Sequence, residues 1–287
     1  MPELPEVETV ARGLRLVLPG RGIVRVRLSA KTDFIEDPAS LERELPGTRV
    51  TSVARYGKFL VIDLERARAD AADGDGKIAL LIHLGMTGQI VVGAAEAPIA
   101  AHTHAFFTLD DGRELRYTDI RRFGRIRILV DGEREAVLGP LGLDPLEASE
   151  AQFREIIGSR KARIKALLMD QRVFRGMGNI YTDESLFRAR IHPKRLGTKL
   201  SEAELRRLFR AMRGVLNEAI RWKGSSVSDY VDSEGQRGEF QMKHRVYQRA
   251  GKKCFRCGGV IRRAIVAGRS SFFCGRCQAA PRGRRKA

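Results

Sequence analysis

The stretch CFRCGGVIRRAIVAGRSSFFCGRC, residues 254–277, contains all four cysteines of this 287-residue chain. They form two CxxC pairs, and each pair can place two thiolates on one tight turn, as tetrahedral Zn(II) requires. Two disulfides or four unrelated buried thiols are the alternatives. Disulfides need an oxidising compartment, and the acidic start MPELPE lacks the apolar segment of a secretory signal. We therefore expect one structural Zn(II) per chain, bound by Cys254, Cys257, Cys274 and Cys277.

The charge around these cysteines indicates the partner. Residues 240–287 include fourteen Lys and Arg and no Asp or Glu, and the whole chain carries a net charge of +18. A basic module of this kind favours phosphate, so nucleic acid is the expected partner class, although charge does not separate DNA from RNA. A basic but passive protein, such as a ribosomal subunit, is the alternative. No apolar run is long enough to span a membrane, and we expect no membrane partner.

The first half of the chain predicts one helix followed by strands. Apolar residues recur at helical spacing from Val7 to Leu18, until Pro19 and Gly20 end the pattern. Short strands are expected at 24–28, 58–64, 78–83, 105–109, 114–117 and 125–130. Because Asp110–Gly112 has hairpin-turn composition, these strands predict an antiparallel sandwich or barrel. Residues 70–76, rich in Ala, Asp and Gly, are expected to form a mobile loop.

The second half predicts helices and then the metal module. The change of pattern near residues 139–145 places a linker at 133–148, so the expected domains are 1–132, 149–239 and 240–287. Helices are expected at 150–157, 163–169, 179–187 and 201–222. The last helix opens with Ser201 and Glu204 at capping-box spacing. Gly176-Met-Gly178-Asn179 leads into a helix N-terminus that can hold an anion; a dinucleotide fingerprint is a weak alternative, because it lacks the third glycine.

The N-terminus offers a nucleophile. Once Met1 is removed, the chain begins with the secondary amine of Pro2, close to the carboxyl groups of Glu3 and Glu6. An α-amine titrates near ~7.7–8.0 and lysine near ~10.4, so more of the α-amine is the free base at neutral pH. Attack of a secondary amine on a sugar C1′ gives an obligatorily cationic iminium, which acidifies the C2′ protons. Taken alone, these residues are more typical of a proline helix start with acidic residues in the first turn than of a nucleophile.

The N-terminal proline and the cysteine pairs belong to a series of motifs that runs along the whole chain. In chain order they are MPELPEVET at 1–9, YGKFL at 56–60, HLGMTG at 83–88, RYTD at 116–119, RRFG at 121–124, GMGNIY at 176–181 and the CxxC pairs. In this order they resemble the bacterial formamidopyrimidine-DNA glycosylases from Met1 to Cys277. The resemblance implies a bifunctional repair enzyme that excises oxidised purines, chiefly 8-oxoguanine and formamidopyrimidines, and then nicks the strand by β,δ-elimination.

The resemblance also implies a multidomain α+β fold. It has a leading helix and antiparallel β-sandwich as the catalytic domain (1–132), a helix-two-turn-helix domain (149–239) and a C-terminal zinc-finger β-hairpin with a basic tail (240–287). The damaged base is expected to enter a cleft between the first domain and the rest. Residues 225–238 match the loop that closes over the flipped base. Their full length, and Leu4, favour oxidised purines over the pyrimidines of endonuclease VIII relatives.

Catalytic roles follow from the resemblance. Pro2 is expected to form the Schiff base, Glu3 to act as general acid and Glu6 to support them. Lys58 is expected to donate a proton in β-elimination and contact phosphate, and Arg269 to hold phosphate in δ-elimination. Without the resemblance, Lys58 reads as a strand-edge surface lysine and Arg269 as one more charge on a solvated loop.

Residues that contact DNA are implied in the same way. Extrusion of a base leaves a gap in the stack, and Met86, Arg121 and Phe123 are expected to fill it. Asn179 resembles a phosphate-binding residue, with a helix N-cap as its ordinary role. For four further positions a DNA contact and a general surface role are equally expected: His102, Arg160, Lys165 and Tyr247.

The expected partner is damaged double-stranded DNA in the bacterial cytoplasm, and the protein is expected to be a monomer with no dedicated protein partner. Two alternatives remain. An endonuclease VIII type enzyme would remove oxidised pyrimidines, and a non-catalytic zinc-ribbon protein would bind DNA or RNA with a purely structural N-terminal proline. Removal of Met1 discriminates between enzyme and binding protein, because a retained methionine leaves no free amine at Pro2.

Overall fold

The computed structural model describes residues 2–66, 77–130 and 132–280. The expected loop at 70–76 therefore lies outside the described residues. Contacts within the chain divide it into two compact units. Unit 1 comprises residues 1–140 and 220–241, and unit 2 comprises residues 141–219 and 242–287.

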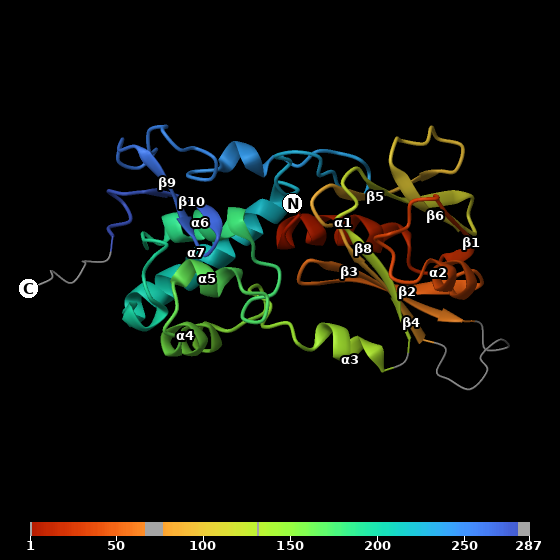
Figure 1. The fold of residues 1–287 in the computed structure, drawn as a ribbon, viewed down its shortest axis with the longest axis horizontal. Helices are drawn as coiled ribbons and strands as arrows, with labels where there is room; N and C mark the ends of the chain where they lie inside the picture. Colours follow the sequence, from red (N-terminus) through yellow and green to blue (C-terminus); the bar gives the residue numbers. More distant parts are fainter. Residues whose placement is uncertain (1, 67–76, 131, 281–287) are drawn as a thin grey trace, which may run out of the picture. The chain divides into compact units, whose positions relative to one another are not determined.

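Unit 1 contains an eight-stranded antiparallel sheet in the order β5-β7-β6-β1-β2-β3-β4-β8. Figure 1 labels most of its strands and helix α1 beside them. Its strands are β1 (Gly22–Leu28), β2 (Thr48–Tyr56), β3 (Phe59–Arg66), β4 (Lys77–His83), β5 (Gly88–Ala94), β6 (Thr103–Leu109), β7 (Arg113–Asp119) and β8 (Arg125–Leu129). Strands β1 and β2 pair only through Gly22–Arg49 and Ile23–Thr48. The sheet therefore has two halves, and one apolar cluster draws on both of them, which confirms the expected sandwich.

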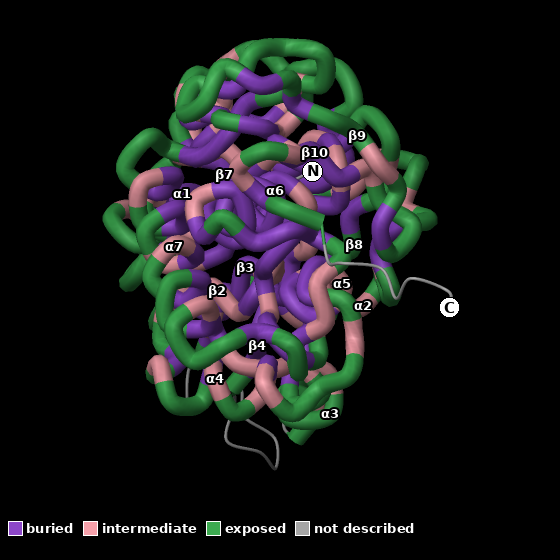
Figure 2. Tube along the Cα trace, turned by 90° about the vertical axis from the view of Figure 1, so that its left-hand side faces the viewer, coloured by how far each residue is buried: buried purple, intermediate pink, exposed green. Residues whose placement is uncertain are grey.

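Helix α1 (Leu4–Val17) covers β2 and β3 with the apolar stripe seen in the sequence. Val7, Val10 and Leu14 are fully buried in the core of unit 1. Figure 2 shows the buried trace following β3 and β7, whose inward side chains form the same core. Two short helices complete the unit: α2 (Pro38–Glu44), and α3 (Glu133–Leu138), which occupies part of the segment expected to be a linker.

Unit 2 is helical with a terminal hairpin. Its helices are α4 (Glu150–Ser159), α5 (Ile164–Met169), α6 (Asn179–Arg188) and most of α7 (Glu202–Arg221), with a short 3-10 turn at Gly197–Lys199. A second 3-10 turn, Phe240–Lys243, begins in unit 1 and ends in unit 2. The capping box predicted for α7 is present, because Ser201 N donates to Glu204 Oε2 at 2.8 Å and Glu204 N to Ser201 Oγ at 3.3 Å. Strands β9 (Ile261–Val266) and β10 (Arg269–Cys274) form an antiparallel hairpin.

The segment 220–241 belongs to unit 1 by its contacts, whereas the sequence grouped residues 225–238 with the second domain. The reason is long-range hydrogen bonding: Ser225 N donates to Glu6 Oε1 at 2.7 Å, and Tyr230 Oη donates to the Glu6 carbonyl at 3.3 Å. Across the described ranges, we find no helix with the length and apolarity needed to cross a membrane.

Candidate active site and zinc finger

The proposed catalytic end of the chain lies at the start of α1, inside unit 1. Pro2 is buried, and Glu3 and Glu6 are only 2% and 1% exposed. Glu3 is the N-cap residue of the helix, and its backbone N–H donates to Glu6 Oε2 at 2.8 Å. The Glu6 carboxylate therefore satisfies one of the free amides of the helix start and fixes the backbone beside Pro2.

Lys58 lies in the β2–β3 hairpin, which is fastened to the same helix. Arg55 Nε donates to Glu8 Oε2 at 3.0 Å, and the Arg55 side chain is only 6% exposed. Gly57, with φ +63°, makes the turn that presents Lys58. Burial, Lys58 and Arg125 lower the pKa of His83 from 6.5 to about 4, so His83 is neutral near Lys58 at neutral pH.

The three residues expected to fill the gap in DNA lie on two adjoining loops of unit 1. Phe123 is 52% exposed, and the Arg121 guanidinium lies over its ring at 4.4 Å. Met86 is half-buried in the turn between β4 and β5. That turn and the Arg121 loop touch at Gly85, where φ is +59° and an added Cβ would overlap the backbone of Phe123. The structure thus brings these residues together on adjoining loops of unit 1.

Asp119 organises this surface and was missed as a functional residue in the sequence. It is fully buried and accepts hydrogen bonds from Thr87 Oγ1 at 2.5 Å, Tyr117 Oη at 3.1 Å and Gly124 N at 2.8 Å. Arg121 N also donates to it, at 3.2 Å. The available signal was its place at the end of the RYTD motif, one residue before RRFG begins. One carboxylate therefore holds the ends of both loops.

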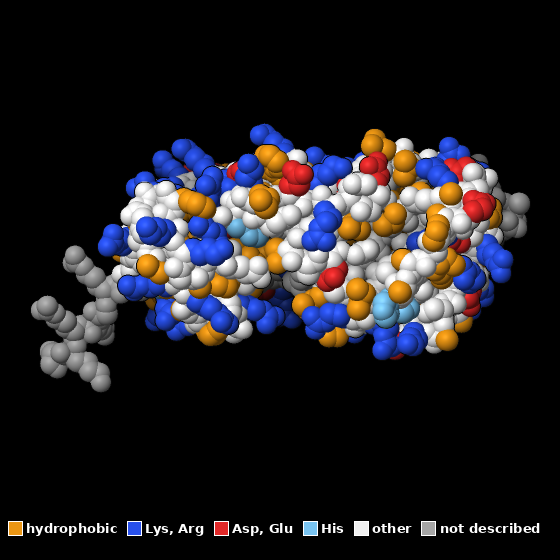
Figure 3. Space-filling model, turned by 90° about the horizontal axis from the view of Figure 1, so that it is seen from above, with side chains coloured by type: hydrophobic (Ala, Val, Ile, Leu, Met, Phe, Trp, Pro, Cys, Tyr) orange, Lys and Arg blue, Asp and Glu red, His pale blue; other side chains and the backbone are white. Residues whose placement is uncertain are grey.

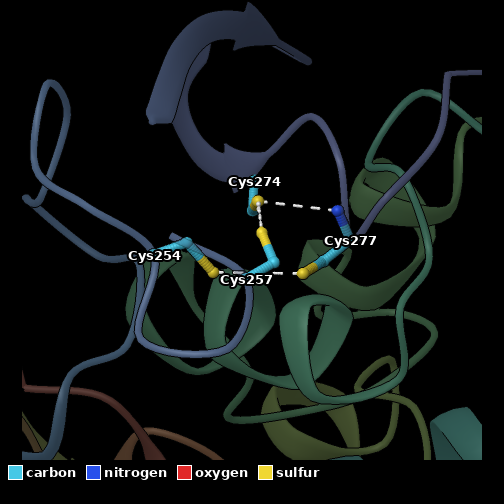
Figure 4. Close-up of side chains that lie close together, drawn as sticks. All are labelled: Cys254, Cys257, Cys274 and Cys277. Carbon is cyan, nitrogen blue, oxygen red and sulfur yellow. Dashed lines mark hydrogen bonds between the residues drawn. The ribbon is translucent and has the colours of Figure 1, made fainter. Parts of the chain in front are cut away.

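In unit 2, the four cysteine side chains point toward one another (Figure 4). All four Sγ atoms lie within 4.8 Å of one another; Cys254 and Cys277 are 3.9 Å apart, and Cys257 and Cys274 are 3.4 Å apart. A tetrahedron with Zn–S bonds of ~2.3 Å has S–S edges of about 3.8 Å, so the cluster fits zinc. The Cys277 N–H also approaches Cys274 Sγ at 3.5 Å. These cysteines provide the ligands for one structural Zn(II), as predicted.

The zinc hairpin carries Arg269 at its tip. Val266 pairs with Arg269, and both intervening residues have positive φ, Ala267 at +51° and Gly268 at +70°, as in a two-residue hairpin turn. Arg269 is exposed. The turn therefore exposes the Arg269 side chain to solvent at the end of a short hairpin.

Lys165 is fully buried rather than at a surface, so its side chain does not have the exposure that a direct DNA contact needs. Its Nζ donates to Asp183 Oδ1 at 2.7 Å and to the Ser270 carbonyl at 3.0 Å. Asp183 Oδ2 accepts from Phe272 N at 2.8 Å. This ion pair ties helices α5 and α6 to strand β10, directly beside Arg269.

The other expected DNA contacts differ in exposure. Asn179 is half-buried at the first turn of α6 after Gly178, the N-cap residue. Tyr247 is half-buried, and its ring lies 5.3 Å from that of Phe272. His102, with φ +62°, and Arg160 are exposed. On the face shown in Figure 3, Lys and Arg are the more frequent charged side chains, in keeping with the net charge of +18.

Comparison with known proteins decides the family. Three family models match the chain. The model of the formamidopyrimidine-DNA glycosylase N-terminal domain matches residues 1–126, and the model of the formamidopyrimidine-DNA glycosylase H2TH domain matches residues 141–231. The model of the zinc finger found in FPG and IleRS matches residues 251–280. The formamidopyrimidine-DNA glycosylase of Heliobacterium modesticaldum is 46% identical over 289 residues, covering 97% of this chain and 100% of that protein. This chain belongs to the formamidopyrimidine-DNA glycosylase family.

Other members of the family are similar to this chain over nearly its full length. The enzyme of Solibacter usitatus is 46% identical over 280 residues, covering 97% of this chain and 99% of that protein. The crystal structure of MutM (Fpg) from Thermus thermophilus matches with a TM-score of 0.83 and 39% identity, covering 98% of this chain and 100% of that one. A complex of Lactococcus lactis Fpg with DNA containing an abasic site matches with a TM-score of 0.85 and 31% identity, covering 97% and 100%. These matches do not favour the endonuclease VIII or zinc-ribbon alternatives.

Proposed function

We propose that this protein is a bifunctional DNA glycosylase and AP lyase of base excision repair, which removes 8-oxoguanine and formamidopyrimidines from double-stranded DNA. The observation that carries the proposal is the buried start of α1, where Glu6 holds the Glu3 amide directly after Pro2. The relatives support the substrate class, since a Lactococcus lactis Fpg variant was solved with Fapy-dG containing DNA. A DNA substrate in a bacterium implies action in the cytoplasm.

Base excision begins at the N-terminal amine. The Pro2 nitrogen forms a bond to C1′ while the bond from C1′ to the base breaks, and the electron pair and the proton of the amine pass to the base. The C1′–O4′ bond then opens as the nitrogen lone pair forms the iminium, and Glu3 gives its proton to O4′. Glu6 fixes the Glu3 backbone during both steps through the 2.8 Å hydrogen bond.

Strand cleavage follows by two eliminations. The Glu3 carboxylate, which has given its proton to O4′, takes a C2′ proton, and the electron pair of the C2′–H bond shifts toward the iminium to form an enamine. The enamine electrons then expel the phosphate as the C3′–O bond breaks, which restores the iminium. Lys58 contacts the DNA backbone and supplies a proton in this step, while neutral His83 adds no competing charge beside it. A second elimination breaks the C5′–O bond, and Arg269 holds the departing phosphate. Zinc has a structural role: when bound, it closes the finger that carries Arg269, with no open position for water.

The exposed Arg121 and Phe123 enter the gap left by the extruded base together with Met86. The guanidinium of Arg121 hydrogen-bonds the orphaned cytosine, and the Phe123 ring wedges beside it. The 4.4 Å contact between guanidinium and ring orients the pair before DNA binds.

Borohydride trapping tests the proposal. The processed protein is incubated with a duplex containing 8-oxoguanine opposite cytosine, reduced, digested and mapped by mass spectrometry. We expect one covalent adduct, on the peptide that begins with Pro2. The matched control carries one extra, non-removable residue before Pro2, which turns its nitrogen into an amide and should abolish trapping. Absence of an adduct at Pro2 in the processed protein would refute the mechanism.

A further inference from the structure

One face of helix α1, formed by Glu6, Thr9 and Gly13, contacts the loop at residues 225–238, and both lie in unit 1. Glu6 Oε1 accepts the Ser225 N–H at 2.7 Å, and the Tyr230 hydroxyl, which also interacts with Thr9, donates to the Glu6 carbonyl at 3.3 Å. Gly13 faces Ser233 farther along the helix. Positions 6, 9 and 13 follow i, i+3 and i+7 spacing, so the contacts share one face of the helix.

Gly13 is the unusual residue on this face of α1, because it is a glycine inside a helix. A glycine in a helix interior costs ~0.5–1 kcal/mol relative to alanine, and its φ here is not positive, so backbone geometry does not require it. Space does require it. An added Cβ would overlap Ser233 Oγ and lie 3.2 Å from Ser233 Cβ. Rotation of the hydroxyl relieves the overlap but not the approach of the two Cβ atoms, which is closer than an ordinary van der Waals contact.

Ser233 is held from its other side as well. Its carbonyl accepts the Val92 N–H of strand β5 at 3.1 Å. The turn around it is rigid, because Asp232 Oδ1 accepts the amides of Glu234 at 3.0 Å and Gln236 at 2.9 Å. A side chain on the helix therefore pushes against a turn that the hydrogen bond to β5 holds on its opposite side.

We infer that Gly13 is a positioning residue for base recognition: its missing side chain sets how closely the loop 225–238 docks on α1. The inference rests on the proposed function, in which this loop covers the flipped base. The catalytic end of α1 depends less on this docking, because Glu3 N donates to Glu6 Oε2 whereas Ser225 N donates to Glu6 Oε1. A shift of the loop therefore leaves the hydrogen bond beside Pro2 in place.

The test compares two glycines. Gly13→Ala and Gly13→Val are matched with Gly214→Ala and Gly214→Val, because Gly214 lies inside α7 and an added Cβ there meets nothing within 4 Å. Single-turnover excision of 8-oxoguanine is measured beside nicking of a preformed abasic duplex. We expect Gly13→Ala to slow excision about threefold to tenfold and Gly13→Val on the order of a hundredfold, with nicking affected far less. The Gly214 variants should match the wild type in both reactions.

Two further readouts separate docking from folding. Trp222 is the only tryptophan and directly precedes the loop, so its emission should shift in the DNA-free Gly13 variants and not in the Gly214 variants. Gly13→Ala should not lower the melting temperature, because alanine favours the helix. Adding Ser233→Gly to Gly13→Ala should restore excision and the emission of Trp222.

Wild-type excision by Gly13→Val, or no rescue by Ser233→Gly, would overturn the inference. If the wild-type protein excises no oxidised purine, the proposed function fails and the inference fails with it. That result is distinct from an active wild type with active Gly13 variants, which would refute the inference alone.

Discussion

Replacement of Lys165 by methionine separates a buried structural lysine from a lysine that contacts DNA. Lys165 is fully buried, with Nζ 2.7 Å from Asp183 Oδ1 and 3.0 Å from the Ser270 carbonyl. Methionine has a similar length but leaves the Asp183 carboxylate buried without its cation. Breaking a buried pair in this way costs about 3–5 kcal/mol, a large part of a typical unfolding free energy of roughly 5–15 kcal/mol.

The pH dependence of this loss has a definite sign. Burial raises the pKa of Asp183 from 3.8 to about 7, against the opposing effects of Lys165 and the Phe272 amide. A carboxyl with a raised folded pKa favours folding below pH 3.8, and this contribution is lost as pH rises toward 7. Without Lys165 the pKa rises further, so the variant should be more destabilised at about pH 8 than at about pH 5.5.

Urea unfolding followed by circular dichroism measures this stability, and Lys161→Met is the matched control. Lys161 is exposed, so its replacement should change the unfolding free energy by less than about 0.5 kcal/mol. DNA affinity is measured over a range of salt for folded Lys165→Met. Loss of one phosphate contact would reduce the slope of log K against log salt by about 0.9, and we expect no such reduction. Unchanged stability together with a reduced slope would refute the buried role.

Three further outcomes follow from the structure. Cys257→Ser should lose zinc and DNA affinity together, measured by metal analysis and fluorescence anisotropy; unchanged DNA binding by the metal-depleted protein would contradict a clamping finger. Burial, Lys58 and Arg125 lower the pKa of His83, so the wild-type protein should lose unfolding free energy as pH falls from 6.5 to about 4. In urea titrations His83→Gln should lack this loss, which is at most about 3 kcal/mol. Glu184→Gln should lower the free energy of unfolding in urea by about 1–3 kcal/mol, because Glu184 is fully buried and its oxygens accept the amides of residues 245–247 at 2.9–3.0 Å.

Local patterns predicted the elements whose chemistry is repetitive. The stripe from Val7 to Leu18 gave helix α1, and the cysteine spacing gave the zinc site. Strand β2 was missed because a register irregularity between Val50 and Ser52 breaks the alternation of buried and exposed residues. Helix α2 was missed because only Leu41 is buried in its seven residues, which leaves no stripe to detect.

In the candidate site too, local motifs were predictable from the sequence and contacts between distant residues were not. The N-terminal motif predicted Pro2 and Glu3 as catalytic residues, but no local pattern places the loop 225–238 on helix α1. That placement depends on a hydrogen bond between Glu6 and Ser225, which lie 219 positions apart. Lys165 was expected at a surface because lysine is almost never fully buried unless paired, and its partner is eighteen positions away on another helix.

Buried carboxylates explain how a chain with a net charge of +18 holds its functional loops. Loops lack a core of their own, so their backbone needs fixed acceptors. Asp119 holds the loop that carries Arg121, Glu184 accepts amides at the entrance to the zinc module, and Asp183 accepts one on strand β10 beside Arg269. Replacement of such a carboxylate by the amide of the same shape keeps one acceptor oxygen but removes the charge. It also puts an NH₂ donor opposite a backbone N–H donor, where no hydrogen bond can form. These acids are therefore as essential to the geometry of the site as the basic residues that they position.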